Sequence, residues 1–556
     1  MEGTVAVEPC RFITSADDLV WDNAADLVIV GFGGAGVVAA LEGLERGATV
    51  IALDRFDGGG ATALSGGIVY AGGTEQQKEA GYNDCAEAMR RYLELENVPV
   101  SSETLQHFCD SSAANLAWLT SQGVEFDSSL YTGKATYPPE GKFLYFCGNE
   151  KLPTYAAIAK PAPRGHRTVG KGFTGRIYFD ALRRSALTKG AKLISHAPVR
   201  RLIVDQSGAV VGLEADLLPE ERVKEHQKLY RKVNPILPLN GKRAERAIAQ
   251  CRMLEESSGA KRIRVRATRG VVLATGGFIY GMEHLTRHRP DLAAVYPALM
   301  RMGSMGCDGS GIALGTTAGG ATALMENTFI GRSLSPPEAF LHGLLINREG
   351  KRFVNEDAYI GTVGNAIIRQ SDSGSAWLIT DKRTFWQGIK DAFSLGFGMF
   401  FYWGLPALIN ITLGKTRRAA TLEKLAEKCG IDSHQLKCTM AQYNEDITEN
   451  RADSLGKQPA NCAVLGDTGW YAINVSTHNR FGATSAFTLG GLSVDEGTGA
   501  VKRTDGSCIE GLYAAGRAAV GLCSTAYMSG LSLADTVFSG RRAAASATTK
   551  TTEYTN

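Results

Sequence analysis

The sequence lacks the features of several protein classes. It has almost no net charge, because 60 Lys and Arg face 57 Asp and Glu, so a general affinity for nucleic acid is not expected. Its 11 cysteines include no Cys-x-x-Cys pair, which disfavours a structural zinc site and indicates free thiols in a reducing compartment. The N-terminal stretch carries acidic residues and no apolar core, so a secretory signal is not expected. We therefore expect a cytoplasmic protein.

Glycine, in contrast, is abundant. It makes up 65 of 556 residues, and it has no triplet period, which excludes a collagen-like chain. Residues of apolar type account for 44%, enough for a large core, and the length favours two domains over one. The glycine excess therefore points to close backbone approaches, as in nucleotide-binding loops.

The first such loop follows a predicted strand at 26–31. The loop GFGGAG contains Gly31, Gly33 and Gly36, and it leads into a helical pattern and then a second strand that ends at Asp54. The glycines permit a tight turn and the approach of a pyrophosphate to the helix N-terminus, and Asp54 is placed to bind ribose hydroxyls. This βαβ unit predicts dinucleotide binding.

A second glycine-rich stretch, residues 58–73, shows neither helical nor strand periodicity. It is either a surface loop or a second contact with a phosphate or flavin, and its position after the ribose-binding strand favours the contact.

The rest of the chain divides by pattern. Residues 80–130 look helical, 191–213 predict two or three strands of a small sheet with a turn at Gly208, and 262–277 predict a strand ending in Ala-Thr-Gly-Gly. A mixed, irregular region follows, and the pattern of an apolar strand that ends in glycine appears again at 511–517. We expect a discontinuous nucleotide-binding domain at 24–290 and 490–548, with a second, catalytic domain inserted at 291–489.

Two segments stand apart from this plan. Between residues 220 and 266, thirteen Lys and Arg outnumber six Glu, which usually means a solvated helical face and less often a patch for a membrane or an anionic partner. Residues 392–414 carry no charge and are long enough to span a bilayer, but glycines and a proline interrupt them. We expect a buried or interfacial helix pair there, which leaves an apolar lid or a peripheral membrane contact as functional alternatives.

Three segments together carry a family resemblance. They are GFGGAG with Asp54, ATGG at 274–277, and GLYAAGR at 511–517. The chain resembles, over nearly its whole length, the fumarate reductase/3-ketosteroid dehydrogenase flavoproteins. It is more closely similar to the 3-ketosteroid Δ4-dehydrogenases, through PAPRGHR (161–167), LINREGKRFVNEDAY (345–359), FTLGGL (487–492) and the long stretch at 513–543.

The resemblance implies an α/β fold, in which a doubly wound, Rossmann-like and discontinuous FAD domain carries an inserted α+β catalytic domain. It also implies noncovalent FAD, a steroid substrate, and introduction or reduction of the C4–C5 double bond. The sequence has no second G-x-G-x-x-G motif that would indicate an NAD(P) site. Electrons are therefore expected to pass to or from an unidentified partner.

The chain departs from the fumarate reductase branch. It has no His-Pro-Thr motif, and Ala526–Gly530 stands where that branch has an arginine before the flavin-binding glycines. A dicarboxylate would be poorly paired there. A fumarate- or urocanate-type reductase of a small unsaturated acid, and a non-catalytic FAD-binding protein that docks on membranes, remain the alternatives.

Tyr527 and Ser529 are the candidate catalytic pair, because in an extended segment they share one face. By resemblance, Tyr527 binds the C3 carbonyl, Ser529 takes the C4 proton, and Tyr359 assists as a relay. Capping of the following helix is the alternative role for both. No histidine–carboxylate spacing suggests a metal. The candidate cofactor-binding residues are Gly31, Gly33, Gly34, Ala35, Gly36, Asp54, Arg55, Ala61, Thr62, Ser65, Gly66, Gly67, Val199, Thr275, Gly276, Asp308, Gly516, Leu531, Ser532 and Leu533.

Overall fold

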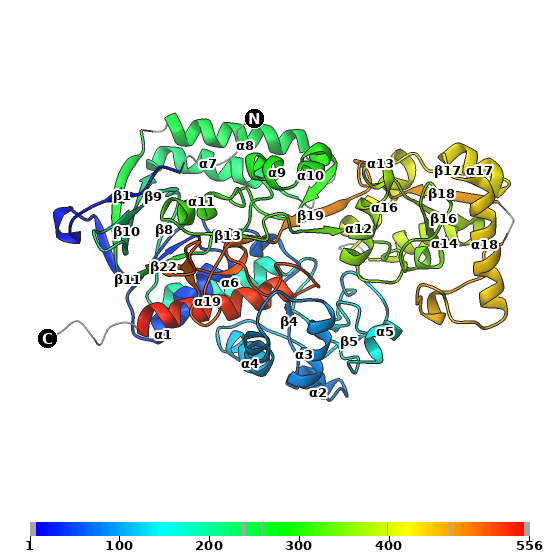
Figure 1. The fold of residues 1–556 in the computed structure, drawn as a ribbon, viewed down its shortest axis with the longest axis horizontal. Coiled ribbons are helices and arrows are strands. Elements are labelled where there is room, and N and C mark those ends of the chain that lie inside the picture. Colours follow the sequence, from blue (N-terminus) through cyan, green and yellow to red (C-terminus); the bar gives the residue numbers. More distant parts are fainter. Residues whose placement is uncertain (1–6, 236–240, 258, 397–398, 467–468, 550–556) are drawn as a thin grey trace.

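The computed structural model describes residues 7–235, 241–257, 259–396, 399–466 and 469–549 (Figure 1). Its larger part is built on a nine-stranded sheet in which β2 (Asn23–Val30), β3 (Val50–Leu53) and the end of β11 (Lys261–Leu273) run parallel. These strands are almost continuously apolar, as expected of strands that are covered on both faces. Ligands bind at the carboxyl ends of such strands.

The strands predicted at 191–213 belong to this main sheet and do not form a small separate one. They are β8 (Lys192–Ile194), β9 (Val199–Val204) and β10 (Val210–Leu217). The long strand β11 explains the difference, because its first half pairs antiparallel with β10 and its second half pairs parallel with β2. A prediction from local periodicity cannot see that one strand serves both partners.

Helices cover both faces of the sheet. Leu27 and Ile29 of β2 point into a core with α1 (Gly34–Glu45), α4 (Ser102–Ser121), α6 (Gly175–Thr188) and α19 (Leu531–Thr549). Val28 and Val30 point into a second core with α7 (Glu220–Lys232), α8 (Gly241–Ser257) and α11 (Ser310–Thr317). In Figure 1, α1 and α19 lie side by side although they come from opposite ends of the chain.

The smaller part of the molecule, residues 332–483, is called the cap below. Its antiparallel sheet has the order β15 (Leu344–Ile346), β16 (Trp377–Asp381), β18 (Trp470–Asn474), β17 (Arg417–Ala419). The helices around it are α12 (Ile360–Ile368), α13 (Ser371–Gly374), α14 (Lys382–Ser394), α16 (Leu405–Leu413), α17 (Leu422–Cys429) and α18 (Ser433–Thr448).

The antiparallel strands β14 (Thr328–Gly331) and β19 (Thr484–Thr488) connect the cap to the larger part (Figure 1). Leu299, Ile312 and Ile330 pack with the main sheet, whereas the two apolar cores inside the cap draw almost entirely on residues 334–475. The limits 291 and 489 for an inserted domain stay a prediction.

The region predicted to be helical at 80–130 contains α3 (Ala86–Leu95) and α4, as expected. None of the described helices is long and apolar enough to cross a membrane. The remaining strands are β1 (Arg11–Phe12), β4 (Ile68–Tyr70), β5 (Leu130–Tyr131), β6 (Leu144–Tyr145), β7 (Gly165–Arg167), β12 (Leu299–Arg301), β13 (Thr322–Ala323), β20 (Gly491–Leu492), β21 (Ala500–Lys502) and β22 (Cys508–Ala514), and the remaining α-helices are α2 (Glu75–Glu79), α5 (Pro153–Ala156), α9 (Met282–His288) and α10 (Pro290–Val295).

Candidate active site

One cavity of about 370 Å³ lies between the main sheet and the cap. All three candidate catalytic residues line it, and so do all the candidate cofactor-binding residues except Gly36, Asp308 and Leu531. Segments from the beginning, middle and end of the chain thus meet around one space. The candidate residues on its wall are Tyr359, Tyr527, Ser529, Gly31, Gly33, Gly34, Ala35, Asp54, Arg55, Ala61, Thr62, Ser65, Gly66, Gly67, Val199, Thr275, Gly276, Gly516, Ser532 and Leu533.

The three fingerprint glycines have different roles in the first loop. Gly31 has a φ of +93°, and a Cβ there would lie 2.8 Å from the Ala274 carbonyl oxygen. A Cβ at Gly36 would overlap the Gly31 carbonyl, so Gly36 allows the turn and does not itself reach the cavity. Gly33 meets only the Gly59 carbonyl at 3.8 Å and leaves the backbone open to a ligand.

Two helix N-termini reach this cavity. Helix α1 begins at Gly34, and α19 begins at Leu531, two residues after Ser529. Ser532 and Leu533 line the cavity, whereas the Leu531 side chain is fully buried in the apolar core. The free amides of a first helical turn carry positive partial charge, so both ends suit the negative parts of a ligand.

Asp54 holds the loop around the cavity. Its two carboxylate oxygens accept the backbone N–H groups of Phe32 at 2.7 Å and of Phe56 at 2.8 Å. Burial raises the pKa of Asp54, and these hydrogen bonds oppose the rise. Gly58 donates a third backbone hydrogen bond to this carboxylate, which has about four acceptor positions, so room remains for a ribose hydroxyl and that contact stays a prediction.

Arg55 lines the cavity, and two carboxylates hold its charge in place. Its guanidinium bonds to Glu255 of α8 at 2.7 and 3.1 Å and to Asp308 at 3.0 Å. Asp308 therefore serves as a partner of Arg55 and not as part of the wall. Glu255 comes from the basic stretch, so that stretch is more than the solvated face predicted for it: α7 and α8 also bury polar groups against the nucleotide-binding part.

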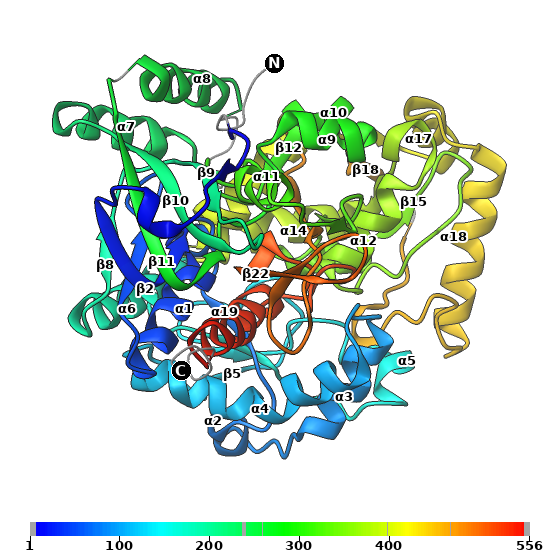
Figure 2. The same ribbon diagram turned by 60° about the vertical axis from the view of Figure 1, so that its left-hand side comes forward.

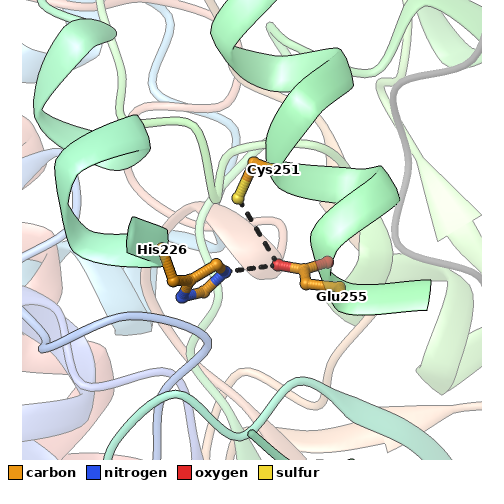
Figure 3. A group of neighbouring side chains, drawn as sticks. All are labelled: His226, Cys251 and Glu255. Carbon is orange, nitrogen blue, oxygen red and sulfur yellow. Dashed lines mark hydrogen bonds and ion pairs between the residues drawn. The ribbon is translucent and has the colours of Figure 1, made fainter. Parts of the chain in front are cut away.

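Figure 3 shows His226 and Cys251 pointing toward Glu255. The His226 Nε2 lies 2.8 Å from a Glu255 oxygen, and its Nδ1 lies 2.8 Å from His196 Nδ1. The nitrogen, sulfur and oxygen atoms of His226, Cys251 and Glu255 that could bind a metal lie within 4.8 Å of one another, a grouping that sequence spacing did not indicate. Because Glu255 already binds Arg55 through both oxygens, we interpret the group as an ion-pair network; the expectation of no metal stays a prediction.

Tyr527 and Ser529 both face the cavity, whereas Met528 between them is 1% exposed and belongs to the core. This alternation is the one expected of an extended segment. The Ser529 Oγ lies 3.4 Å from the Tyr359 hydroxyl. This hydrogen bond goes to a tyrosine of the cap and not to an α19 amide, which argues against the capping role.

The site keeps its tyrosines protonated. Tyr527 stands edge-on to Phe329 and Phe487, with ring centroids 5.0 and 4.8 Å away. Burial raises the pKa of Tyr527 and of Tyr359 well above the usual value, so both hydroxyls remain donors at neutral pH. Burial also raises the pKa of Tyr145, which no sequence pattern singled out, and an interaction with Ser529 partly offsets this rise. The Tyr145 hydroxyl donates to the Thr136 carbonyl at 3.5 Å.

The residues present fit an FAD molecule. The buried Thr275 Oγ1 has no hydrogen-bond partner within the described part of the chain, and Thr275 lines the cavity. Gly33 leaves room for backbone approach, and the two helix N-termini offer amides to phosphate and to the flavin edge. The cap closes the other side with Leu378, Trp403 and Ile473, and with Arg332, which the sequence analysis did not single out.

Comparison with known proteins agrees with this geometry. Residues 26–533 match the family model described as FAD binding domain. The chain is 35% identical to the 3-oxo-5-alpha-steroid 4-dehydrogenase of Comamonas testosteroni over 91% of this chain and 94% of that protein. It is 25% identical to the cytochrome-type fumarate reductase of Shewanella frigidimarina, over 94% of this chain and 76% of that protein.

A solved structure is similar as well. The 3-ketosteroid-delta4-(5alpha)-dehydrogenase of Rhodococcus jostii RHA1, in complex with 4-androstene-3,17-dione, matches with a TM-score of 0.78 and 29% identity, covering 97% of this chain and all of that one. The match confirms the predicted doubly wound fold with its inserted domain. The chain belongs to the FAD-binding flavoprotein family that contains the 3-ketosteroid dehydrogenases and the fumarate reductases.

Proposed function

We propose that this protein is an FAD-dependent 3-ketosteroid Δ4-dehydrogenase, which introduces the C4–C5 double bond of a 3-oxosteroid. The observation that carries the proposal is the placement of Tyr527, Ser529 and Tyr359 on one wall of the cavity that also holds the nucleotide-binding loops. Their pattern is the one that the resemblance to the steroid dehydrogenases predicts. When bound, FAD supplies the hydride acceptor.

The tyrosines and the serine divide the remaining chemistry. The Tyr527 hydroxyl donates to the C3 carbonyl and stabilises the negative charge that develops on it. Ser529 takes the C4 proton, but a lone serine is a weak base at neutral pH. It therefore needs an onward path for the proton, and the hydroxyls of Tyr359 at 3.4 Å and of Tyr145 provide it.

The competing reductase of small acids is less compatible with this site. The cap side of the cavity is mostly apolar, and Tyr359 and Tyr527 are uncharged donors. Such a wall suits a large apolar ligand better than a dicarboxylate, which needs several cations.

Anaerobic absorbance of the bound flavin tests the assignment. A 3-oxo-5α-steroid should bleach the flavin, and succinate should not. Bleaching by succinate alone would favour the small-acid reaction, and bleaching by neither would favour a non-catalytic FAD-binding protein. A 3-oxo-5β-steroid belongs in the same experiment. The 5α and 5β epimers carry the C5 hydrogen on opposite faces, so the epimer that bleaches the flavin shows which face of the steroid is turned toward the flavin.

We also propose that an external carrier, a quinone or another flavoprotein, exchanges electrons with the flavin. A single dinucleotide fingerprint supports this, since NAD(P) would need its own site. Steady-state turnover with a soluble quinone, compared with NAD+, tests it: turnover with NAD+ alone would contradict the proposal.

A third proposal concerns the membrane. The hairpin of α14, the π-helical η5 (Phe400–Gly404) and α16 has an inner and an outer face. Tyr402, Trp403 and Pro406 line the cavity, whereas Phe393 and Phe401 are 64% and 46% exposed. A steroid partitions into bilayers, so we infer that this hairpin contacts a membrane surface and forms the entry route of the substrate.

Sedimentation with liposomes tests the membrane contact. The wild type should sediment, and Phe393→Ser with Phe401→Ser should sediment less, while Val464→Ser, a change at another exposed apolar residue, should have no effect. A wild type that never sediments would leave the hairpin as a lid only. Retention after a carbonate wash would mean that the attachment is integral and not peripheral.

A further inference from the structure

Arg332 is a buried cation on the cap side of the cavity. It follows β14, it is 4% exposed, and it lines the same cavity as Tyr359 and Tyr527. Its terminal nitrogens donate to the Thr484 hydroxyl at 3.2 Å and to the Asn474 carbonyl at 3.3 Å. Both acceptors are neutral, and both bonds are long for a charged donor.

No carboxylate within the described residues forms an ion pair with this guanidinium. Other buried arginines of the chain do have acidic partners: Arg164 pairs with Asp84, and Arg352 pairs with Glu356 and Asp453. Burial lowers the pKa of Arg332 to about 9, whereas the carboxylates raise the pKa of Arg352. An unpaired charge in the interior is strongly unfavourable, so its presence in a ligand cavity indicates that a partner arrives from outside.

The surroundings of Arg332 contain more donors than acceptors. Besides Arg332, Asn410 at 3.2 Å and Asn479 at 2.9 Å donate to the same Asn474 carbonyl oxygen. A carbonyl oxygen has two lone pairs, so three donors exceed its capacity. An oxygen of a bound ligand would relieve this excess.

The chain also provides space for the guanidinium. A Cβ at Gly482 would overlap the terminal nitrogens of Arg332, so the absence of a side chain there accommodates the cation. The neighbouring cavity wall is apolar and includes Leu378, Ile411 and Ile473. Tyr527 stands between Phe329 and Phe487. Arg332 follows Phe329 by three residues and bonds to Thr484, three residues before Phe487, so about 10 Å of strand separates the two groups.

We propose that Arg332 binds a carboxylate at the end of the substrate remote from the 3-oxo group, so that the preferred substrates are 3-oxosteroids with an acidic side chain. This inference rests on the proposed function. The apolar wall would hold the ring system, Tyr527 the ketone, and Arg332 with Asn410 the carboxylate. A charge-assisted hydrogen bond in a buried site would then set substrate preference and leave the chemistry at C4 and C5 unchanged.

The test compares one steroid in two forms, a 3-oxo-5α-steroid acid and its methyl ester, in anaerobic flavin reduction. The wild type should show a kcat/KM for the acid on the order of 10- to 100-fold above that for the ester. Arg332→Gln should remove most of this ratio, and Arg332→Lys should retain part of it. Arg480→Gln is the matched control, because Arg480 is an exposed arginine near the same connection and stacks on Phe481.

A wild-type ratio of acid to ester kcat/KM near one would overturn the proposal. An equal loss of both reactions in Arg332→Gln would also overturn it, because that result means that Arg332 only ties β14 to β18. A wild-type ratio near one overturns the proposal even if the variants do not fold, and the Arg332 variants assign a preference for the acid to this residue rather than to Arg517, which also lines the cavity. If neither compound bleaches the flavin, the proposed function fails; equilibrium binding of the acid, followed through the flavin spectrum, then tests Arg332 separately. Tighter binding of acid than of ester that is lost in Arg332→Gln supports the carboxylate site, and equal binding contradicts it.

Discussion

At the scale of single residues, the hydroxyl of Tyr527 carries the sharpest prediction. Phe at this position keeps the ring between Phe329 and Phe487 and removes only the donor to the developing oxyanion. We expect Tyr527→Phe to slow flavin reduction by about 100-fold or more, with unchanged FAD content and thermal stability. Stopped-flow reduction by a 3-oxosteroid measures this. Near wild-type rates with correctly bound FAD would refute the role of Tyr527.

Ser529 allows a second test at this scale, because its two proposed roles predict different results. If it takes the C4 proton, Ser529→Ala should slow flavin reduction by about 100-fold or more. If it only capped α19, the change would lower stability by about 1 kcal/mol and leave the rate intact. Tyr359→Phe and Tyr145→Phe should each slow the reaction less than Ser529→Ala, since the remaining tyrosine still contacts the serine. Equal rates of flavin reduction for the wild type and these three variants would contradict the relay.

At the scale of elements, the α7–α8 hairpin depends on Glu255. This carboxylate binds Arg55 and His226, and its removal leaves the buried charge of Arg55 with Asp308 as its remaining acidic partner. We expect Glu255→Gln to lower the free energy of unfolding by about 3–5 kcal/mol. Glu256→Gln on the same helix should change it by less than about 1 kcal/mol, because Glu256 is exposed and pairs with Arg252 at the surface. Urea unfolding of the holoprotein measures both.

The pH dependence of this element has a definite sign. Arg55 and His226 hold the pKa of Glu255 at about 2, below the usual value of about 4.3. A lowered folded-state pKa adds stability that is complete above about pH 5 and is lost as the pH falls from there toward 2. The difference between the wild type and Glu255→Gln should therefore be constant from neutral pH down to about pH 5 and shrink below pH 4. A difference that grows on acidification would contradict this network.

At the scale of the whole molecule, the cavity joins the two parts of the protein, and the cofactor is expected to stabilise their arrangement. Figure 2 shows α1 and α19 beside β2 and β22, and the cap helices α17 and α18 away from them at the right-hand edge of the molecule. A ligand that binds only the folded state adds about 2.7 kcal/mol at 100 times its Kd. We expect the yellow holoprotein to melt at a temperature that rises with added FAD, and denaturation to release intact FAD. Release of FMN, or flavin that stays attached, would contradict noncovalent FAD.

Local sequence pattern determined much of this protein. The strand, glycine loop, helix and Asp54 appear where the fingerprint predicted them, because a βαβ unit is specified by neighbours in the chain. The alternation of Tyr527, Met528 and Ser529 was likewise readable, since strand-like periodicity is local. The C-terminal pattern also showed that the nucleotide-binding part is discontinuous, and so the family was evident before any contact was known.

Only the tertiary structure decided what depends on long-range contact. Arg55 turns to Glu255, 200 residues away, because burying its charge demands acidic partners that no spacing rule connects. β11 extends the main sheet because one strand can pair with different neighbours along its length. Tyr145 and Arg332 reach the site from segments with no motif, since packing alone places Tyr145 beside Ser529 and Arg332 on the cap side of the cavity. Sequence determines the elements and the chemistry they can carry, and packing decides which side chains share a cavity.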